Sequence, residues 1–184
     1  MFELFKQKAE AINAEVHKFS SKAEALEFIK DFIKQNTSTK LSKEVVWYES
    51  EFLEGVDKDA LQKELPQIEF NINLNSASSA KIGINQVDFG IAETGSLVEI
   101  SDEISKRLCS SLPEIHIAIL PISKILPDME SVMKQINLKN IPYMTVISGP
   151  SRTADIERVL TIGVHGPERV VILCIDKFLG GIDG

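Results

Sequence analysis

Two glycine-containing junctions carry the side chains with the clearest capacity for chemistry. The first, residues 90–98, places a carboxylate and two hydroxyls between two apolar runs. At a strand end facing a cleft, Glu93 can act as nucleophile, general acid or general base, while Thr94 and Ser96 orient a ligand. The same residues are typical of a hairpin tip, in which Gly95 adopts a positive φ and the glutamate is solvated. Composition alone leaves both interpretations open.

The second junction, residues 147–157, is an apolar run that breaks into a hydroxyl-rich turn. We expect this turn to open a helix over 152–160, where free N–H groups and a partial positive charge would favour a carboxylate or phosphate. Plain helix capping, with Pro150 in the first turn, is the alternative interpretation. The candidate anion-binding residues here are Ser148, Gly149, Ser151, Arg152 and Thr153.

The histidines add one candidate and no metal site. No two of them have the helical spacing of a metal-binding pair, so the sequence predicts no metal ligand. We expect structural roles for His17, on a helix, and for His116, inside an apolar run. His165 lies in a Gly-Pro loop that follows the predicted 152–160 helix, where an exposed imidazole can titrate near neutral pH, and it completes the candidate set.

Familiar catalytic and nucleotide-binding motifs are missing. Residues 149–153 begin like the G-x-S-x-G nucleophile elbow, but Thr153 replaces the second glycine that the strained turn requires. The sequence contains neither G-x-G-x-x-G nor a Walker Gly-Lys-Ser/Thr loop. Binding of a dinucleotide, or of a nucleotide through a P-loop, therefore has no support.

Composition narrows the class of protein further. The chain has 184 residues, with 20 Lys and Arg against 27 Asp and Glu and a net charge of -7, which disfavours nucleic-acid binding. No apolar run reaches the roughly 18–20 residues of a membrane span, and the start lacks the apolar region of a signal peptide, so we expect a cytoplasmic protein. With only Cys109 and Cys174, both expected to be buried, the chain cannot by itself supply the four thiolates of an iron–sulfur cluster.

The elements that must position these residues follow from hydrophobic periodicity. We predict helices over 5–16 and 21–35, the second opened by a Ser21–Glu24 capping box, then a polar linker. Residues 1–40 thus form an N-terminal helical segment, and residues 41–184 the main domain. Further helices are expected over 102–110, 128–136 and 152–160. Strands are expected over 45–48, 68–72, 89–92, 96–100, 115–120, 143–147 and 170–175.

The order of these elements predicts the fold class. The last three strands are nearly unbroken apolar runs, typical of strands covered on both faces, and they alternate with helices. Residues 89–100 instead indicate a tight hairpin. We therefore expect an α/β three-layer sandwich with a mixed, mostly parallel sheet and N-terminal helices.

At the two junctions the chain resembles the LUD domain family, and within it the small stand-alone members called lactate utilization protein C. Residues 91–98, residues 147–157 and the segment 163–167 are similar to the sequence hallmarks of that family. The likeness covers roughly residues 45–175 and leaves the two N-terminal helices outside. It implies a fold similar to the sugar-phosphate isomerase and CoA-transferase group.

The resemblance also implies a role as an accessory subunit in oxidation of L-lactate to pyruvate. The partners would be an iron–sulfur oxidoreductase and a LUD-ferredoxin-type protein, which would hold the clusters while this chain has no cofactor. Two alternatives remain: a stand-alone enzyme that transfers an acyl or formyl group, and a regulatory module that binds a small carboxylate or phosphate. CoA transferases of similar fold use a glutamate as acyl acceptor, but for Glu93 this is analogy, and its role is unassigned.

Overall fold

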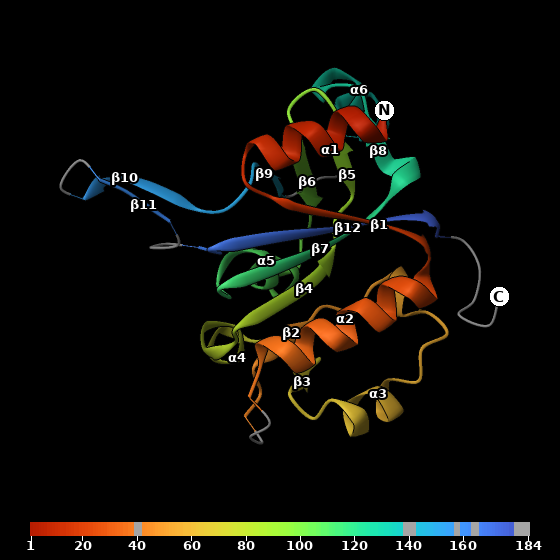
Figure 1. The fold of residues 1–184 in the computed structure, drawn as a ribbon, viewed down its shortest axis with the longest axis vertical. Helices are drawn as coiled ribbons and strands as arrows, with labels where there is room; N and C mark the ends of the chain where they lie inside the picture. The colour runs from red at the N-terminus through yellow and green to blue at the C-terminus, as the bar shows by residue number, and fades with distance from the viewer. Residues whose placement is uncertain (39–41, 138–142, 157–158, 163–165, 179–184) are drawn as a thin grey trace.

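The computed structural model describes residues 1–38, 42–137, 143–156, 159–162 and 166–178, with the backbone alone over the strands between 153 and 162. Its centre is a six-stranded sheet in which every neighbouring pair is parallel (Figure 1). In spatial order the strands are β1 (Glu15–Ser21), β12 (Arg169–Lys177), β7 (Ile115–Pro121), β4 (Ile82–Gln86), β2 (Val45–Trp47) and β3 (Ile68–Glu69).

Helices cover both faces of this sheet. Because successive side chains of a strand point to opposite faces, Ile117 and Ile119 of β7 pack in the cluster under α2 (Lys22–Asn36) and α3 (Lys58–Glu64). Ala118 and Leu120 pack with α1 (Phe2–Ala11) on the other face. That face is completed by α4 (Leu74–Ser79) and α5 (Ile104–Ser111) beside β2 and β4. The predicted fold class is confirmed.

A second, four-stranded sheet lies beneath α1 (Figure 1). It contains the predicted hairpin, with β5 antiparallel to β6, so this prediction is confirmed. Its edge strand β9 leaves Val146 41% exposed, and the expectation that this apolar run is covered on both faces is wrong. The order is β8 (Ile125–Leu126), β5 (Phe89–Ile91), β6 (Ser96–Ile100) and β9 (Met144–Ile147), with α6 (Met129–Gln135) packed on β5 and β8.

The helix predicted over 5–16 is wrong in its second half. α1 ends at Ala11, the chain reverses at Asn13 with φ +67°, and Val16 lies in strand β1. Asparagine tolerates this left-handed conformation better than most residues, and the spacing of Ala9, Ile12 and Val16 fits a helix followed by a strand as well as one helix. His17 is therefore on β1, beside Phe28, and not on a helix.

The division of the chain near residue 40 stays a prediction. The part before residue 40 contributes strand β1 to the main sheet.

The helix predicted over 152–160 is also wrong. The chain there forms an antiparallel ribbon of β10 (Arg152–Ile156) and β11 (Val159–Ile162), with Arg152 opposite Ile162. The β-branched residues of this segment favour strands, and the antiparallel pairing supplies the hydrogen bonds that a helix would otherwise make. The ribbon extends away from the two sheets (Figure 1).

Other predicted elements are confirmed where the cause is local. Ser21 caps α2, since its Oγ accepts from Glu24 N–H at 3.3 Å, although Glu24 reaches back to Ser20 N–H and not to Ser21. α5, α6, β7 and β12 also fall where expected. Sequence reasoning missed β4, whose Gly83 and Asn85 interrupt the apolar pattern. No helix in the described residues is both long and apolar enough to cross a bilayer.

Candidate functional site

The two junctions meet at the C-terminal end of α1. Ser96 Oγ lies 2.8 Å from Ser148 Oγ, across the β6–β9 pair. A Cβ on Gly95 would lie 2.1 Å from Ala9 N, and one on Gly149 would lie 2.3 Å from Ile12 O. Both glycines have φ near +70°. The glycines are therefore required where α1 packs directly on the strand ends, and we call Gly95, Ser96, Ser148, Gly149 and Arg152 the α1 contact.

The remaining candidates of the junctions that the structure describes make contacts of their own. Glu93 and Thr94 are exposed at the hairpin tip, where Glu93 N–H donates to Pro127 O at 3.0 Å. Ser151 N–H donates to Pro167 O. Its neighbour Arg152, which belongs to the α1 contact, donates from Nη2 to Ile12 O at 2.8 Å. Because Arg152 opens a strand, the helix start expected to bind an anion does not exist.

The side chains of the last two candidates lie outside the described part of the structure. Thr153 lies in β10, with its side chain outside the description, and His165 lies outside the described residues. A site role for the nine candidates stays a prediction. Among the described residues, none of the nine candidates lines the pocket next to Lys106, the one next to Leu26 or the one next to Tyr48.

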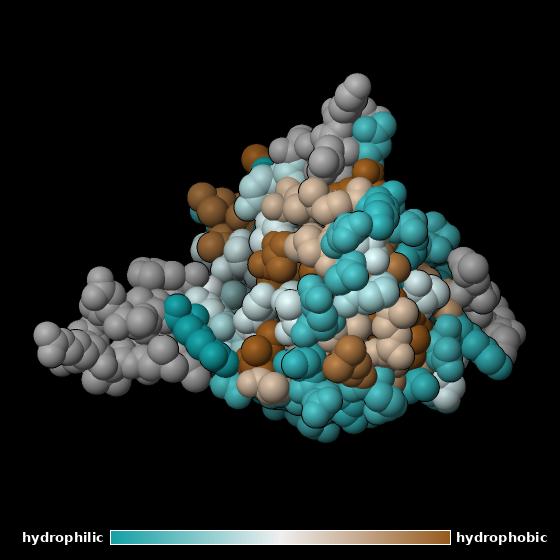
Figure 2. All heavy atoms as spheres, turned by 90° about the horizontal axis from the view of Figure 1, so that it is seen from above, coloured by the Kyte–Doolittle hydropathy of each residue, from teal (hydrophilic) through white to brown (hydrophobic). Residues whose placement is uncertain are grey.

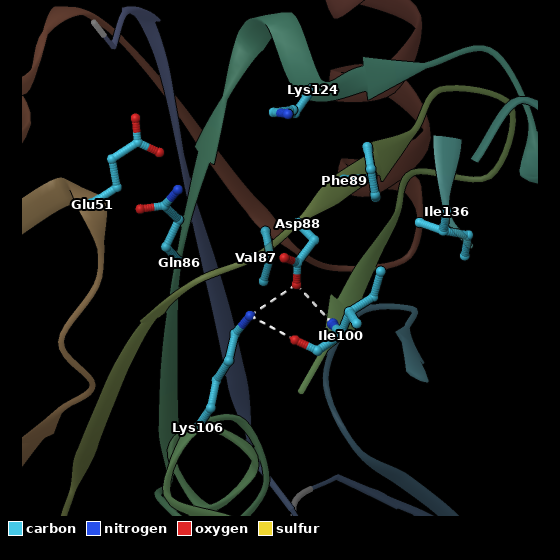
Figure 3. Close-up of a pocket in the computed structure, with 9 residues that line it drawn as sticks. All are labelled: Glu51, Gln86, Val87, Asp88, Phe89, Ile100, Lys106, Lys124 and Ile136. Carbon is cyan, nitrogen blue, oxygen red and sulfur yellow. Dashed lines mark hydrogen bonds and ion pairs between the residues drawn. The ribbon is translucent and has the colours of Figure 1, made fainter. Parts of the chain in front are cut away.

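One of these pockets lies at the carboxyl ends of the central strands and encloses about 350 Å³ (Figure 3). The chain passes from β3 across β2 to β4, so the strand order reverses here, and such switch points are where open α/β sheets bind ligands. Its polar lining comes from the last residue of β4, from the segments after β2, β4 and β7, and from α5. Its apolar lining comes mainly from the second sheet and the end of α6. The lining residues are Glu51, Gln86, Val87, Asp88, Phe89, Ile100, Lys106, Lys124 and Ile136.

An ion pair forms the floor of this pocket. Lys106 Nζ lies 2.8 Å from Asp88 Oδ2 and donates to Ile100 O at 2.9 Å. Ile100 N–H donates to the same carboxylate oxygen at 2.7 Å. Lys106 is only 9% exposed, so the ion pair is screened less than a surface pair. The three groups hold one another in place, as the dashed lines of Figure 3 show.

Behind the ion pair runs a buried chain of three polar side chains. His116 Nε2 lies 2.9 Å from Asn85 Oδ1, and Asn85 Nδ2 donates to Glu99 Oε2 at 2.6 Å and to Lys106 O at 3.3 Å. Since Asn85 Oδ1 only accepts, His116 donates from Nε2. His116 Nδ1 and Glu99 Oε1 have no hydrogen-bond partner among the described residues. All three side chains are at most 1% exposed, so each unpaired atom is energetically costly.

Burial shifts the titration of both ends of this chain. Desolvation lowers the pKa of His116 to about 4, so the imidazole is neutral at pH 7. Desolvation also raises the pKa of Glu99, an effect that the hydrogen bond from Asn85, the nearby hydroxyl of Ser110 and the charge of Lys106 oppose. The two cysteine thiols, buried as predicted and in separate clusters, have their pKa raised to about 12 by desolvation.

The pocket therefore offers fixed charges and hydrogen-bonding groups and no preformed metal centre. No group of three His, Cys, Asp or Glu side chains within the described residues is arranged to hold a metal ion. Lysine and carboxylate groups can bind a small polar molecule and move protons. Sequence reasoning missed this pocket because its charged residues are scattered from position 51 to position 124, and the one available signal was the polar Gln86-Val87-Asp88 step between two apolar runs.

The family model of the LUD domain matches residues 2–175, and the chain belongs to the LUD domain family. The match begins in α1, so the expectation that the likeness leaves the N-terminal helices outside is wrong. The reason is physical: β1 is part of the main sheet, and α1 packs on both glycines of the α1 contact.

Curated relatives match part of the chain. It is 38% identical over 109 residues to lactate utilization protein C of Halalkalibacterium halodurans, 36% over 110 residues to that of Bacillus subtilis, and 37% over 110 residues to the uncharacterized protein YkgG of Escherichia coli. These alignments cover 56% of this chain and 47%, 45% and 48% of the relatives, so the chain spans about half the length of the curated relatives it matches.

Among solved structures, the chain is similar to a DUF162 family protein from Deinococcus radiodurans. The TM-score is 0.58 at 16% identity, and the alignment covers 95% of both chains. At that identity the likeness shows the fold, which agrees with the parallel sheet and helical layers of this structure.

Proposed function

We propose that this protein is an accessory subunit of a system that oxidises L-lactate to pyruvate. The observation that carries the proposal is its membership of the LUD domain family, together with 36–38% identity to relatives named lactate utilization protein C. Its place of action would be the cytoplasm, in contact with an iron–sulfur oxidoreductase and a LUD-ferredoxin-type protein.

In this proposal the electrons travel through clusters held by the partners. A cluster needs several thiolate ligands, and this chain has two cysteines in all. Both are buried, lie in different packing clusters and have pKa values raised to about 12, so neither is available as a thiolate at neutral pH. These residues do not fit a cluster, which supports a role in binding or assembly and not in electron transfer.

The test is lactate-dependent dye reduction in extracts of cells that lack only this chain. We expect the deletion to abolish reduction and wild-type protein to restore it. Undiminished reduction without the chain would contradict the proposal. A Glu93→Gln arm tests the hairpin site separately: failure of a folded, well-expressed variant to complement supports a functional role for Glu93, and full complementation contradicts it.

The pocket favours a second candidate function, that of a stand-alone enzyme or a regulatory module that binds a small anion. Its carboxylates and lysines are the kinds of group that acyl or formyl transfer and anion sensing both use. Turnover by the purified chain alone would support the enzyme, whereas ligand-dependent thermal stabilisation without turnover would support the module.

A further inference from the structure

The pocket at the carboxyl ends of the central strands, which we call the carboxyl-edge pocket, has walls of different chemical character. Glu51 and Gln86 lie on one side, and Phe89, Ile100 and Ile136 lie on the opposite side, with Lys124 above and the Asp88–Lys106 pair below (Figure 3). A ligand that fits both walls must therefore have a polar end with hydrogen-bonding groups and an aliphatic part. About 350 Å³ is near the lower end of the range for small-molecule sites, roughly 300–1,000 Å³.

The charged side chains that line the pocket restrict the charge of the ligand that it can bind. Asp88 is neutralised by Lys106 and accepts the N–H of Ile100, so this pair contributes no net charge to the pocket. Of the described residues that line it, the remaining charged ones are Lys124 and Glu51, both exposed. One ammonium and one carboxylate suit a ligand with a single negative charge and a separate hydrogen-bond donor. A dianion such as hydrogen phosphate would be repelled by Glu51.

Two contacts hold the polar groups in position. Gln86 Oε1 accepts from Phe52 N–H at 3.1 Å, which orients the amide and leaves its Nε2 as the donor for a ligand oxygen. Lys124 Nζ lies 5.7 Å from the centroid of the Phe89 ring, so its ammonium is at the boundary between the polar and the apolar wall. A carboxylate bound at Lys124 would direct an attached alkyl group toward Phe89.

We propose that this pocket binds a small monocarboxylic acid that carries a hydroxyl or amino group next to its carboxylate. The carboxylate binds Lys124, and the alkyl part contacts Phe89. A hydroxyl donates to Glu51 and accepts from Gln86 Nε2, whereas an ammonium group only donates to Glu51. The Asp88–Lys106 pair is a positioning element beneath the ligand. The inference rests on the proposed function only in the choice of L-lactate as the first probe.

The experiment is calorimetric titration of the purified chain with L-lactate, 2-hydroxybutyrate and L-alanine, against propionate and inorganic phosphate. We expect a hydroxy or amino acid to bind at least tenfold more tightly than propionate, which lacks the donor, and phosphate not to compete. Lys124→Met should weaken binding at least tenfold without changing the thermal midpoint. Lys34→Met is the matched control. Lys34 is an exposed, paired lysine on α2 that does not line this pocket, so its substitution should leave the affinity unchanged.

Several outcomes would overturn the inference. They are no binding of any of the three acids, equal affinity for propionate, or unchanged affinity in folded Lys124→Met. The proposed function fails separately. If deletion of the chain abolishes lactate-dependent dye reduction but the purified chain binds no probe, the function stands and this site is wrong. If the acids bind as expected and deletion has no effect, the site stands and the function is wrong.

Discussion

The α1 contact and the carboxyl-edge pocket both join residues that are distant in sequence, but they do so for opposite purposes. At the α1 contact, glycines let backbone atoms approach so closely that a Cβ would lie 2.1 Å from Ala9 N. At the pocket, side chains from separate segments, among them the Asp88–Lys106 ion pair, surround about 350 Å³ of open volume. A pattern of glycines, hydroxyls and an arginine therefore indicates close packing as readily as it indicates a ligand.

Gly95→Ala should produce the largest loss of stability. The substitution forces alanine into φ +70° and places its Cβ against the α1 backbone, so we expect a loss of about 3 kcal/mol or more in urea denaturation. Gly55→Ala is the control, since Gly55 also has a positive φ, +83°, but no atom lies within 4 Å of the added Cβ. Strain alone should cost about 1 kcal/mol there. Equal losses would show that contact with α1 is not what requires Gly95.

The buried polar chain behind the pocket should make stability depend on pH. The pKa of His116 falls from 6.5 to about 4 on folding, so between these values the unfolded state binds more protons. Unfolding free energy is then lost as pH falls from 6.5 toward 4, by about 3 kcal/mol. Denaturation of His116→Gln across this range should lack that loss. An unchanged profile would contradict burial of a neutral imidazole.

Glu99 should act with the opposite sign. Its pKa is raised above 4.5 in the folded state, so its contribution to stability is full below pH 4.5 and is lost as pH rises through the raised pKa. In wild type this loss offsets part of the gain from His116. Glu99→Gln should therefore show a steeper rise of unfolding free energy above pH 4.5 than wild type. Parallel profiles would mean that Glu99 titrates alike in both states.

Ser148→Ala should have the smallest effect, about 1 kcal/mol. It leaves the hydroxyl of Ser96, which is 3% exposed, without its partner at the α1 contact. A double-mutant cycle with Ser96→Ala should give a coupling energy of about 0.5–1.5 kcal/mol. Coupling near zero would separate the two hydroxyls energetically and weaken the view of this contact as one packed unit.

Local chemistry made several elements predictable from the sequence. The hydroxyl of Ser21 capped α2 as expected, because capping involves groups only three residues apart. The unbroken apolar runs of β7 and β12 could be recognised as buried strands, since a strand covered on both faces needs apolar side chains at nearly every position. Gly95 at the tip made the hairpin of β5 and β6 predictable.

The pocket could not be found in this way. Asp88 and Lys106 are 18 positions apart, and nothing in either neighbourhood indicates that they pair. Strand β4 itself was missed because Gly83 and Asn85 break its apolar pattern. Their reasons lie in other elements: a Cβ on Gly83 would lie 2.0 Å from Cys109 O of α5, and Asn85 bridges His116 and Glu99.

By itself, then, the sequence determined the α/β class, the capped helix, the buried parallel strands and the hairpin, since each depends on periodicity or on groups a few residues apart. Only the tertiary structure decided that residues 152–162 pair as strands, that Val16 joins the main sheet, and that the glycines of both junctions support α1. It also decided where the charges gather. Strand order alone determines which chain segments meet at the carboxyl edge, and that order depends on long-range pairing that no local pattern encodes.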